Sequence, residues 1–252
     1  MAENSSKPSF SIITVTFNSA QTLAQTMESV LTQKVMPKEY LIIDGVSQDD
    51  TLAIARGYHD AFKDKGTELI IVSELDRGIY DAMNKGIRIA SGDIIGIINS
   101  DDWYEKNALE TVAKHFAENP FDLFYADLRM HFGDGRTFVK HSKNRKYATS
   151  RDWNHPTTFI TKDAYDRFGT YKIDNMHDDY DLILRLKKGN ARTTVSNETI
   201  ANFRMNGMSH KRSIVRAIKS VGLKYRIYRQ NGYSPLYLFE CIAQEAGKLI
   251  IG

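Results

Sequence analysis

The feature that most constrains the fold is a unit that occurs four times in the first 120 residues: a short apolar run, a polar loop and a stretch with helical spacing. This alternation predicts a parallel β-sheet covered by helices on both faces. Asn18 and Ser19 are placed to cap the first helix. The predicted strands are residues 9–17, 40–44, 68–73 and 93–99, and the predicted helices are residues 20–33, 51–62, 79–90 and about 107–118.

The pattern loosens in the next part of the chain. Residues 123–131 and 136–140 resemble strands and flank Gly133-Asp134-Gly135, which predicts a β-hairpin. Residues 141–154 are polar and basic and show no periodicity, so they are predicted to form a mobile loop.

Two helices are predicted near the C-terminus. Helical spacing returns at about 209–230, and Ser234-Pro235 opens a second helix that runs to about residue 250. Eight Lys or Arg and no Asp or Glu lie between Arg204 and Phe239. This local positive charge fits either the solvated face of a packed helix or a contact with an anionic membrane surface.

Composition excludes several classes of protein. Lysine plus arginine exceed aspartate plus glutamate by only 34 − 31 = 3, which argues against a dedicated nucleic-acid binder. Cys241 is the only cysteine, so an intrachain disulfide and a multi-cysteine metal site are excluded. The start of the chain has no apolar core of a signal peptide, and no run reaches the roughly 20 apolar residues of a membrane span. We expect a cytoplasmic protein, at most peripheral on the inner face of the membrane.

The most informative segment is residues 94–103, IIGIINSDDW. An apolar strand that ends in Asp101 and Asp102 places two carboxylates at the edge of the sheet where ligands bind. The two carboxylates repel each other unless a cation neutralises them, and Mg²⁺ or Mn²⁺ bound to a diphosphate needs only one or two protein carboxylates. The alternative is that both residues merely cap the next helix.

A second acidic cluster lies at residues 175–185, NMHDDYDLILR, where Asp178, Asp179 and Asp181 crowd the start of a short amphipathic helix. Acidic residues are favourable at helix N-termini, which accounts for one carboxylate more easily than for three. A carboxylate whose proton affinity is raised by its neighbours is a candidate general base for a hydroxyl group.

Other residues carry weaker signals. His155 and Phe17 are candidates for the site, although an isolated histidine is more often structural and an aromatic residue at a strand end more often belongs to the core. The sequence has no HExxH, no GxxxxGK[ST] and no GxGxxG after the first strand. Zinc hydrolases, P-loop NTPases and Rossmann dehydrogenases are therefore unsupported.

The ordered set of segments resembles glycosyltransferase family 2, whose members are inverting enzymes of the GT-A fold, a Rossmann-like and mainly parallel sheet flanked by helices. The stretch SELDRGIYDAMNKGI is similar to bacterial members that build O-antigen, capsule or exopolysaccharide. The matching segments are SIITVTFNSAQTL, YLIIDGVSQDDT, SELDRGIYDAMNKGIRIASGDIIGIINSDDW, NHPTTFITKDAYDRFGTY and HDDYDLILRL. The resemblance implies a catalytic domain at 1–205, with a nucleotide-sugar half at about 9–120 and an acceptor half at about 121–205, and a helical extension at 206–252.

The resemblance also implies roles for single residues. Asp179 matches the general base, with Asp178 beside it, and Asp102 is the expected ligand of Mn²⁺ or Mg²⁺. Asp101 is expected near the ribose or the metal. The expected nucleotide-sugar contacts are Thr16, Phe17, Asp44, Asp76, Arg77 and Asp101, and the expected acceptor-side residues are His155 and Arg185.

Two positions depart from the family pattern. Gly45 stands where a second aspartate often follows the second strand, and Asn99 stands where the metal motif usually has its first aspartate.

The implied reaction transfers a sugar, most simply from a UDP-sugar, to a hydroxyl of a glycan or a polyprenyl-diphosphate-linked acceptor in surface polysaccharide synthesis. The alternatives are a sugar-nucleotide nucleotidyltransferase and a noncatalytic nucleotide-binding or scaffold protein.

Overall fold

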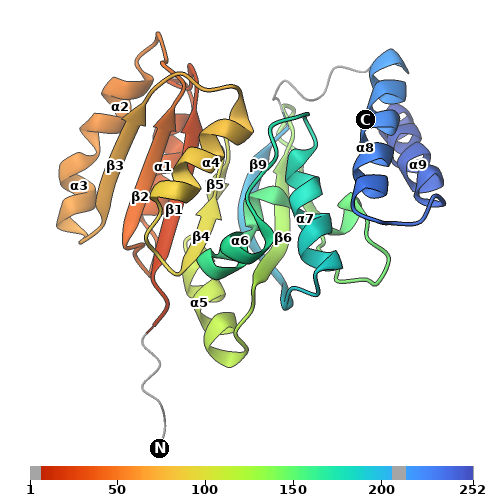
Figure 1. Cartoon of the computed structure of the whole chain (residues 1–252). Coiled ribbons are helices and arrows are strands. Elements are labelled where there is room, and N and C mark those ends of the chain that lie inside the picture. The colour runs from red at the N-terminus through yellow and green to blue at the C-terminus, as the bar shows by residue number, and fades with distance from the viewer. Residues whose placement is uncertain (1–6, 206–213, 252) are drawn as a thin grey trace, which may run out of the picture.

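The chain folds around a nine-stranded sheet with helices on both faces (Figure 1). The computed structural model describes residues 7–205 and 214–251. The strand order is β3-β2-β1-β4-β8-β6-β9-β5, and β7 pairs with β6. The strands are β1 (Phe10–Thr16), β2 (Glu39–Asp44), β3 (Glu68–Ser73), β4 (Ile94–Ile97), β5 (Trp103–Tyr104), β6 (Leu123–His131), β7 (Thr137–Lys140), β8 (Phe159–Thr161) and β9 (Thr193–Arg204).

Helices connect these strands. They are α1 (Leu23–Leu31), α2 (Thr51–Gly57), α3 (His59–Asp64), α4 (Ile79–Ile89), α5 (Ala108–Glu118), α6 (Lys162–Phe168), α7 (Asp178–Lys188), α8 (Ile214–Gln230) and α9 (Tyr237–Ile251). In the described part of the chain, none of these helices has the length and apolarity to cross a bilayer.

The first four strands form the predicted parallel half of the sheet. β1 pairs in parallel with β2 and with β4, and β2 pairs in parallel with β3. The register sets Thr16 opposite Asp44 and Ile13 opposite Ile97. Parallel pairing brings the carboxyl ends of these strands to one edge of the sheet, where their connecting loops meet.

The second half of the sheet is mixed. β8 runs antiparallel to β4 and to β6, whereas β6 and β9 are parallel. The predicted hairpin is confirmed: β6 and β7 pair from Leu128 with Lys140 to His131 with Thr137. Gly135 in the turn has a φ of 86°, which favours glycine.

Alternate side chains of the strands enter two separate cores, as expected for a sheet covered on both faces. Ile13 and Val15 of β1 join a cluster with residues of α4, α6 and α7, while Phe10 and Ile12 join a cluster with residues of α1 and α5. Both faces of β1, β2 and β4 are therefore buried, which explains their nearly continuous apolar sequences, whereas β3 at the edge of the sheet is only partly buried.

Two helix predictions need correction. The helix predicted over 51–62 is broken at Tyr58 into α2 and α3, and the first helix begins at Leu23 rather than residue 20. Asn18 and Ser19 do not cap it. Asn18 has a φ of 50° and accepts a hydrogen bond from the Gln48 backbone, and Ser19 Oγ lies 2.8 Å from Ser100 Oγ. These polar side chains join the strand-end loops to one another instead.

The segment 141–154, predicted to be a mobile loop, is packed against the domain. Ala148 and Trp153 are buried, and Asn154 donates from Nδ2 to the Ala126 carbonyl at 3.1 Å. Ser142 donates to the same carbonyl at 2.6 Å. Buried polar side chains fix this segment through hydrogen bonds, which leave no periodic pattern in the sequence.

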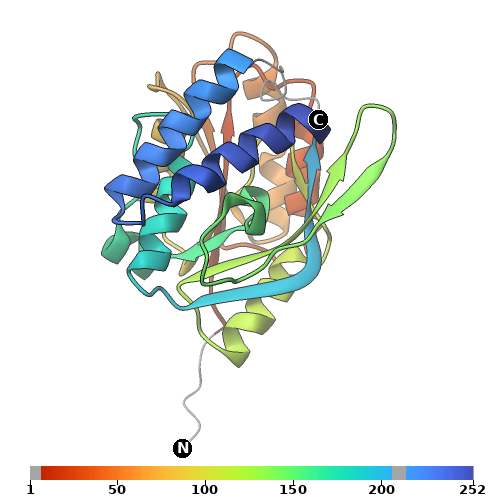
Figure 2. The same cartoon turned by 90° about the vertical axis from the view of Figure 1, so that its right-hand side faces the viewer.

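The two C-terminal helices form a hairpin, the α8–α9 hairpin, which lies across one side of the molecule (Figure 2). Both helices were expected from the sequence, although the predicted start of the first at residue 209 lies outside the described residues. The hairpin packs on α7, where the Tyr228 and Tyr180 hydroxyls are 2.9 Å apart. The division of the chain at residue 205 stays a prediction.

Candidate active site at the carboxyl edge of the sheet

Asp44, the last residue of β2, is fully buried and held by hydroxyl groups. Thr16 and Ser73 donate to its carboxylate at 3.0 and 2.7 Å, and Ser47 donates from both its hydroxyl and its backbone N–H. Burial by itself raises the pKa of Asp44, but the hydrogen bonds from Ser47, Ser73 and Thr16 outweigh it and hold the pKa below the usual value. Asp44 thus stays ionised and fixes the ends of three strands.

An exposed aromatic ring lies beside this carboxylate. Phe17 follows β1 and is 65% exposed, so it is not a core residue. Gly45 separates it from Asp76: a Cβ placed on Gly45 would lie 3.4 Å from Phe17 Cδ2 and 2.6 Å from Asp76 Oδ2. The glycine that departs from the family pattern therefore gives the Asp76 carboxylate room next to β2. Thr16, Phe17, Asp44 and Asp76, all predicted to contact the nucleotide, lie together.

The end of β4 has a different character. Asp102 is 1% exposed; its Oδ1 accepts a 3.2 Å hydrogen bond from the Arg204 backbone, and its Oδ2 is buried without a hydrogen-bond partner among the described residues. Burial, reinforced by the negative charge of Asp101, raises the pKa of Asp102 well above the usual value. Burial also raises the pKa of Asp101. This turn holds two carboxyl groups that the protein leaves short of compensating charge.

These oxygen atoms suit a hard divalent cation. Asn99 Oδ1, at the position of the usual first aspartate, is also buried and unpartnered within the described part of the chain. Mg²⁺ and Mn²⁺ prefer oxygen ligands and take most of the remainder from phosphate and water. No cluster of three or more His, Cys, Asp or Glu suited to a metal occurs among residues 7–205 and 214–251. Asp101, Asp102 and Asn99 fit a cation that a diphosphate helps to hold.

The two adjacent aspartates that begin α7 have different surroundings. Asp178 is fully buried and accepts hydrogen bonds from the Asp174 backbone at 2.6 Å and from the Asn175 backbone and side chain at 2.8 and 2.6 Å. Asp179 is only half-buried. Its Oδ1 accepts a 2.7 Å hydrogen bond from the Tyr180 backbone. The hydrogen bonds of Asp178 close the loop before α7. Asp179 accepts fewer hydrogen bonds and is therefore the better placed of the two carboxylates to accept one from a ligand.

Asp179 lies in a small cluster of aromatic residues. Burial raises the pKa of Asp179, although the nearby His155 and hydrogen bonds from Tyr180 and Tyr80 oppose the rise. Burial also lowers the pKa of His155. Tyr171 connects them, since its ring stacks on Tyr80 at 5.5 Å between centroids and its hydroxyl lies 3.5 Å from His155 Nε2. A carboxylate with a raised proton affinity is suited to accept a proton from a hydroxyl.

The two predicted arginines are placed differently. Arg77 has a 74% exposed side chain at the start of α4 and forms a 3.2 Å ion pair with Asp81. Arg185 is tied into the protein: Nε donates to Asp181 at 2.8 Å and Nη2 to the Thr170 carbonyl at 2.5 Å. These contacts make Arg185 a support for the loop between α6 and α7, while Arg77 has room to swing toward a ligand.

The loops at this edge are joined to each other. Ser19 after β1 contacts Ser100 after β4, and Thr26 of α1 donates to the Asp102 carbonyl at 2.7 Å.

Three residues near the site, Asn99, Tyr80 and Arg204, were not predicted from the sequence to take part in it. Tyr80 and Asn99 lie inside the quoted family segments, which is a usable signal, but Arg204 meets Asp102 across 102 residues of chain.

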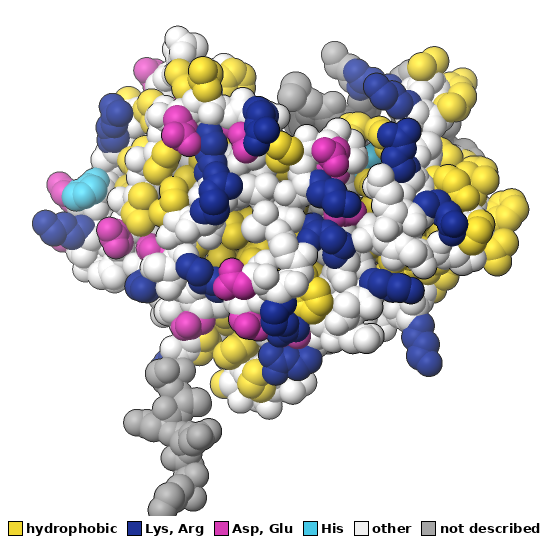
Figure 3. Space-filling view, viewed as in Figure 1, with side chains coloured by type: hydrophobic (Ala, Val, Ile, Leu, Met, Phe, Trp, Pro, Cys, Tyr) yellow, Lys and Arg dark blue, Asp and Glu magenta, His cyan; other side chains and the backbone are white. Residues whose placement is uncertain are grey.

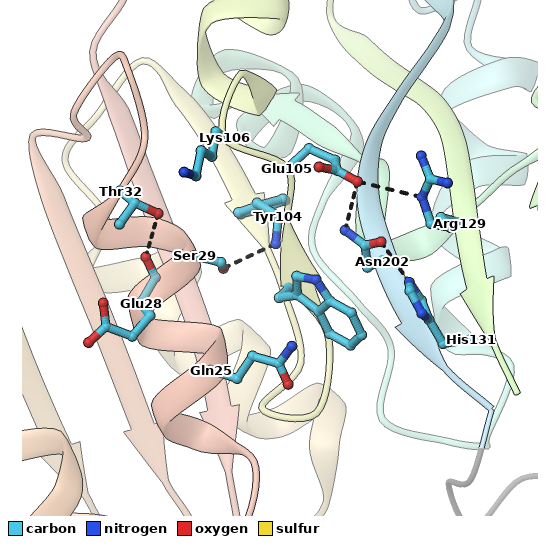
Figure 4. Close-up of a pocket in the computed structure, with 11 residues that line it drawn as sticks. Gln25, Glu28, Ser29, Thr32, Tyr104, Glu105, Lys106, Arg129, His131 and Asn202 are labelled. Carbon is cyan, nitrogen blue, oxygen red and sulfur yellow. Dashed lines mark hydrogen bonds and ion pairs between the residues drawn. The ribbon is translucent and has the colours of Figure 1, made fainter. Parts of the chain in front are cut away.

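A separate open pocket of about 430 Å³ lies between α1, β5 and the ends of β6 and β9 (Figure 4). Glu105 anchors a polar network there: it accepts from Asn202 at 3.2 Å and pairs with Arg129 at 3.6 Å. His131 continues the network to Asn202, and its ring lies tilted against Trp103 with 4.7 Å between the ring centroids. None of the predicted site residues lines this pocket.

Comparison with known proteins identifies the family. The profile of Glycosyl transferase family 2 matches residues 11–177. A PGL/p-HBAD biosynthesis glycosyltransferase of Mycobacterium bovis is 33% identical over 168 residues, which are 66% of this chain and 64% of that protein. An uncharacterized glycosyltransferase of Mycobacterium tuberculosis is 29% identical over 187 residues, covering 71% of this chain and 69% of that protein. The match to the first relative thus spans less than two thirds of its length.

Solved structures share the fold. Residues 1–349 of TarS from S. aureus, described in complex with UDP-GlcNAc, match with a TM-score of 0.66 and 18% identity over 95% of this chain and 72% of that one. The mannosyltransferase PcManGT from Pyrobaculum calidifontis, described in complex with GDP-Man and Mn²⁺, matches with a TM-score of 0.70 and 16% identity over 98% of this chain and 75% of that one. The fold is therefore GT-A, and the family profile, which covers most of the chain, shows that this protein belongs to glycosyltransferase family 2.

Proposed function

We propose that this protein is an inverting, metal-dependent glycosyltransferase that transfers a sugar from a UDP-sugar to a hydroxyl group of a glycan or polyprenyl-diphosphate-linked acceptor. Membership in family 2 supports the reaction class. The observation that carries the assignment of residues is that Asp102, after β4, and Asp179, in the first turn of α7, are both carboxyl groups with a raised pKa. Asp102 Oδ2 is also buried without a hydrogen-bond partner among the described residues.

In the proposed reaction Asp179 removes the proton from the acceptor hydroxyl. The oxygen then attacks the anomeric carbon, the bond from that carbon to the nucleoside diphosphate breaks, and the configuration is inverted. Asp102 and Asp101, with Asn99, would hold the Mn²⁺ or Mg²⁺ ion, which when bound stabilises the charge on the departing diphosphate. His155 and Tyr171 lie near Asp179, the proposed general base, and form part of its surroundings on the acceptor side.

The donor site is proposed at the ends of β1 and β2. Phe17 presents an exposed ring on which a base stacks, and Thr16, Asp44 and Asp76 surround it. Arg77 is free to approach the diphosphate. The UDP-GlcNAc complex of TarS and the GDP-Man complex of PcManGT support a nucleotide-sugar donor. The lone Cys241 agrees with work in the reducing cytoplasm, and a place in bacterial surface polysaccharide synthesis is the proposed biological setting.

A donor panel tests this function. The purified protein is incubated with UDP-, GDP- and dTDP-sugars, with Mn²⁺ or with EDTA, and the released nucleotide is measured. We expect nucleoside diphosphate from a UDP-sugar, release that requires the cation, and a product of inverted anomeric configuration by NMR. Release of pyrophosphate from a nucleoside triphosphate and a sugar phosphate would identify a nucleotidyltransferase instead, and failure to bind any nucleotide would identify a noncatalytic protein.

A further inference from the structure

The helix α9 has its polar and apolar faces reversed relative to an ordinary surface helix. Glu240, Gln244 and Glu245 are buried, whereas Phe239 is 69% and Ile242 is 48% exposed. A helix packed on a globular domain normally turns its apolar side chains inward. The outward apolar face of α9 therefore has no role in the core of this chain.

Ion pairs and hydrogen bonds fix this orientation. Arg151 donates to Glu240 at 2.6 Å, and Lys224 of α8 pairs with Glu245 at 2.6 Å and donates to Gln244 at 2.9 Å. Rotating α9 to bury Phe239 would expose these contacts and leave Lys224 buried without its partner, which is costly. The protein thus holds the apolar face outward by specific interactions.

The helix α8 extends the same outer surface. Ile214, Val215 and Ile218 are 69%, 76% and 68% exposed. Figure 3 shows hydrophobic side chains gathered over α8 and α9 at the right-hand edge, with basic side chains beside them. The exposed basic residues of the hairpin include Lys219, Arg226 and Arg229.

The charge of this surface has one sign. Glu240 and Glu245 are the only acidic residues from position 214 to the end of the sequence, and both are buried in ion pairs. The exposed part of the α8–α9 hairpin therefore combines large apolar side chains with positive charge alone. An anionic lipid surface complements both properties, because apolar side chains enter the acyl region while Lys and Arg contact the head groups.

We propose that the outer face of the α8–α9 hairpin is a docking surface for an anionic lipid bilayer, on which the helices lie without crossing it. A second copy of the chain is a poorer occupant, since a two-fold interface at this face would bring Lys219, Arg226 and Arg229 against the same residues of its partner. The surface contact goes beyond the proposed reaction and does not depend on it.

Docking has a consequence for catalysis, which rests on the proposed function. The hairpin is attached to α7 close to Asp179: Tyr228 meets Tyr180, Asn231 donates to Asp181 at 2.8 Å, and Ser220 Oγ lies 3.0 Å from His177 Nε2. A bilayer that fixes the hairpin also fixes the helix that carries the proposed base. An acceptor anchored in the same bilayer would then be held near that base.

Vesicle flotation tests the proposal directly. The full chain is mixed with phosphatidylcholine vesicles, with or without phosphatidylglycerol, and we expect it to float only with the anionic vesicles. Phe239→Glu removes an apolar contact and should weaken vesicle binding about tenfold or more. Phe138→Glu is the matched control, since Phe138 on β7 is 57% exposed and lies outside the α8–α9 hairpin. Lys219→Gln/Arg226→Gln should weaken binding about 30-fold.

Three results would overturn the docking surface: no flotation of the unaltered chain with anionic vesicles, equal flotation of the Phe239→Glu and Phe138→Glu variants, or dissociation of an oligomer by Phe239→Glu in sedimentation velocity. The last result would make the face a protein interface. Release of nucleotide from a water-soluble donor should be the same in all variants, which separates this proposal from the proposed reaction. If the unaltered chain hydrolyses the donor but does not float with anionic vesicles, only the docking surface is refuted.

Discussion

The end of β2 and the end of β4 each bury an aspartate, yet the protein treats the two carboxyl groups in opposite ways. Asp44 is surrounded by donors from Thr16, Ser47 and Ser73, and its pKa is lowered despite burial. Within the described part of the chain, Asp102 has one backbone donor and a buried oxygen without a partner, and its pKa is raised by burial and by Asp101. Burial alone therefore does not indicate a ligand site. A buried carboxyl group that lacks compensating positive charge and hydrogen-bond donors does indicate one.

The same contrast recurs between adjacent residues of α7. Asp178 is saturated by donors from Asp174 and Asn175, whereas Asp179 is half-buried with a raised pKa. If the distinction is correct, substitutions at Asp44 and Asp178 should change mainly stability, and substitutions at Asp102 and Asp179 should change mainly activity.

The largest effect is expected for Asp179→Asn. The amide cannot accept the proton of the acceptor hydroxyl, so the transfer rate should fall about 10²- to 10⁴-fold while donor binding is retained. Single-turnover transfer and calorimetric donor binding measure the two quantities. Asp178→Asn is the control: it weakens the hydrogen bonds of the preceding loop, so it should lower the free energy of unfolding by about 1–3 kcal/mol. Transfer by Asp179→Asn at the unaltered rate would remove this residue as the base.

Asp102→Asn should have the next largest effect. The variant keeps the shape of the side chain but loses the charge proposed to hold the cation, so cation-dependent release of nucleoside diphosphate should fall about 10²- to 10³-fold. Calorimetric titration of a UDP-sugar with and without Mn²⁺ checks the cause. The difference between the two titrations should shrink in Asp102→Asn and persist in Asp44→Asn; the opposite pattern would reverse the roles of the two strand ends.

The two substitutions should also differ in how stability depends on pH. The raised pKa of Asp102 stabilises the folded protein at acid pH, and this contribution is lost as the pH rises from the usual aspartate range toward the pKa of Asp102 in the folded state. As the pH rises over this range, Asp102→Asn should therefore become more stable relative to the unaltered chain. The lowered pKa of Asp44 contributes stability above the usual aspartate range that is lost on acidification. Asp44→Asn should therefore lose about 1–3 kcal/mol at neutral pH.

Urea unfolding at several pH values, without added metal, measures both effects. The stability difference between each variant and the unaltered chain should have opposite signs at pH 7. Parallel curves for Asp44→Asn and Asp102→Asn would show that the surroundings of the two carboxyl groups do not differ as described.

The parallel half of the sheet and its polar loops were predictable because buried parallel strands have nearly continuous apolar sequences, which end where the loops begin. β9 could not be predicted in this way, because polar residues interrupt its apolar residues and its pairing with β6 shifts register near Asp127. The family resemblance named Asp179 as the general base with Asp178 beside it, but the sequence could not show how their surroundings differ, because the donors that saturate Asp178 depend on the fold of the loop at 174–175. The contact of Arg204 with Asp102 joins residues too far apart for any local pattern.

The smallest predicted effect concerns Gly45, the residue by which the β2 end departs from the family pattern. A Cβ at this position would lie 2.6 Å from Asp76 Oδ2, and because that atom ends a side chain, Asp76 should swing aside while β2 keeps its place. Gly45→Ala is therefore expected to change the free energy of unfolding by less than about 1 kcal/mol and to weaken UDP-sugar binding about threefold to fivefold.

Gly57→Ala is the control for that measurement, since a Cβ at Gly57 meets no atom within 4 Å. Calorimetry of both variants separates a local effect on the donor site from the general effect of replacing a glycine. If Gly45→Ala binds the donor as tightly as Gly57→Ala does, the position of Asp76 does not matter to the nucleotide. The β2 end would then act only through Asp44, as a support for the strand ends, and donor recognition would depend on Phe17 and the β4 end.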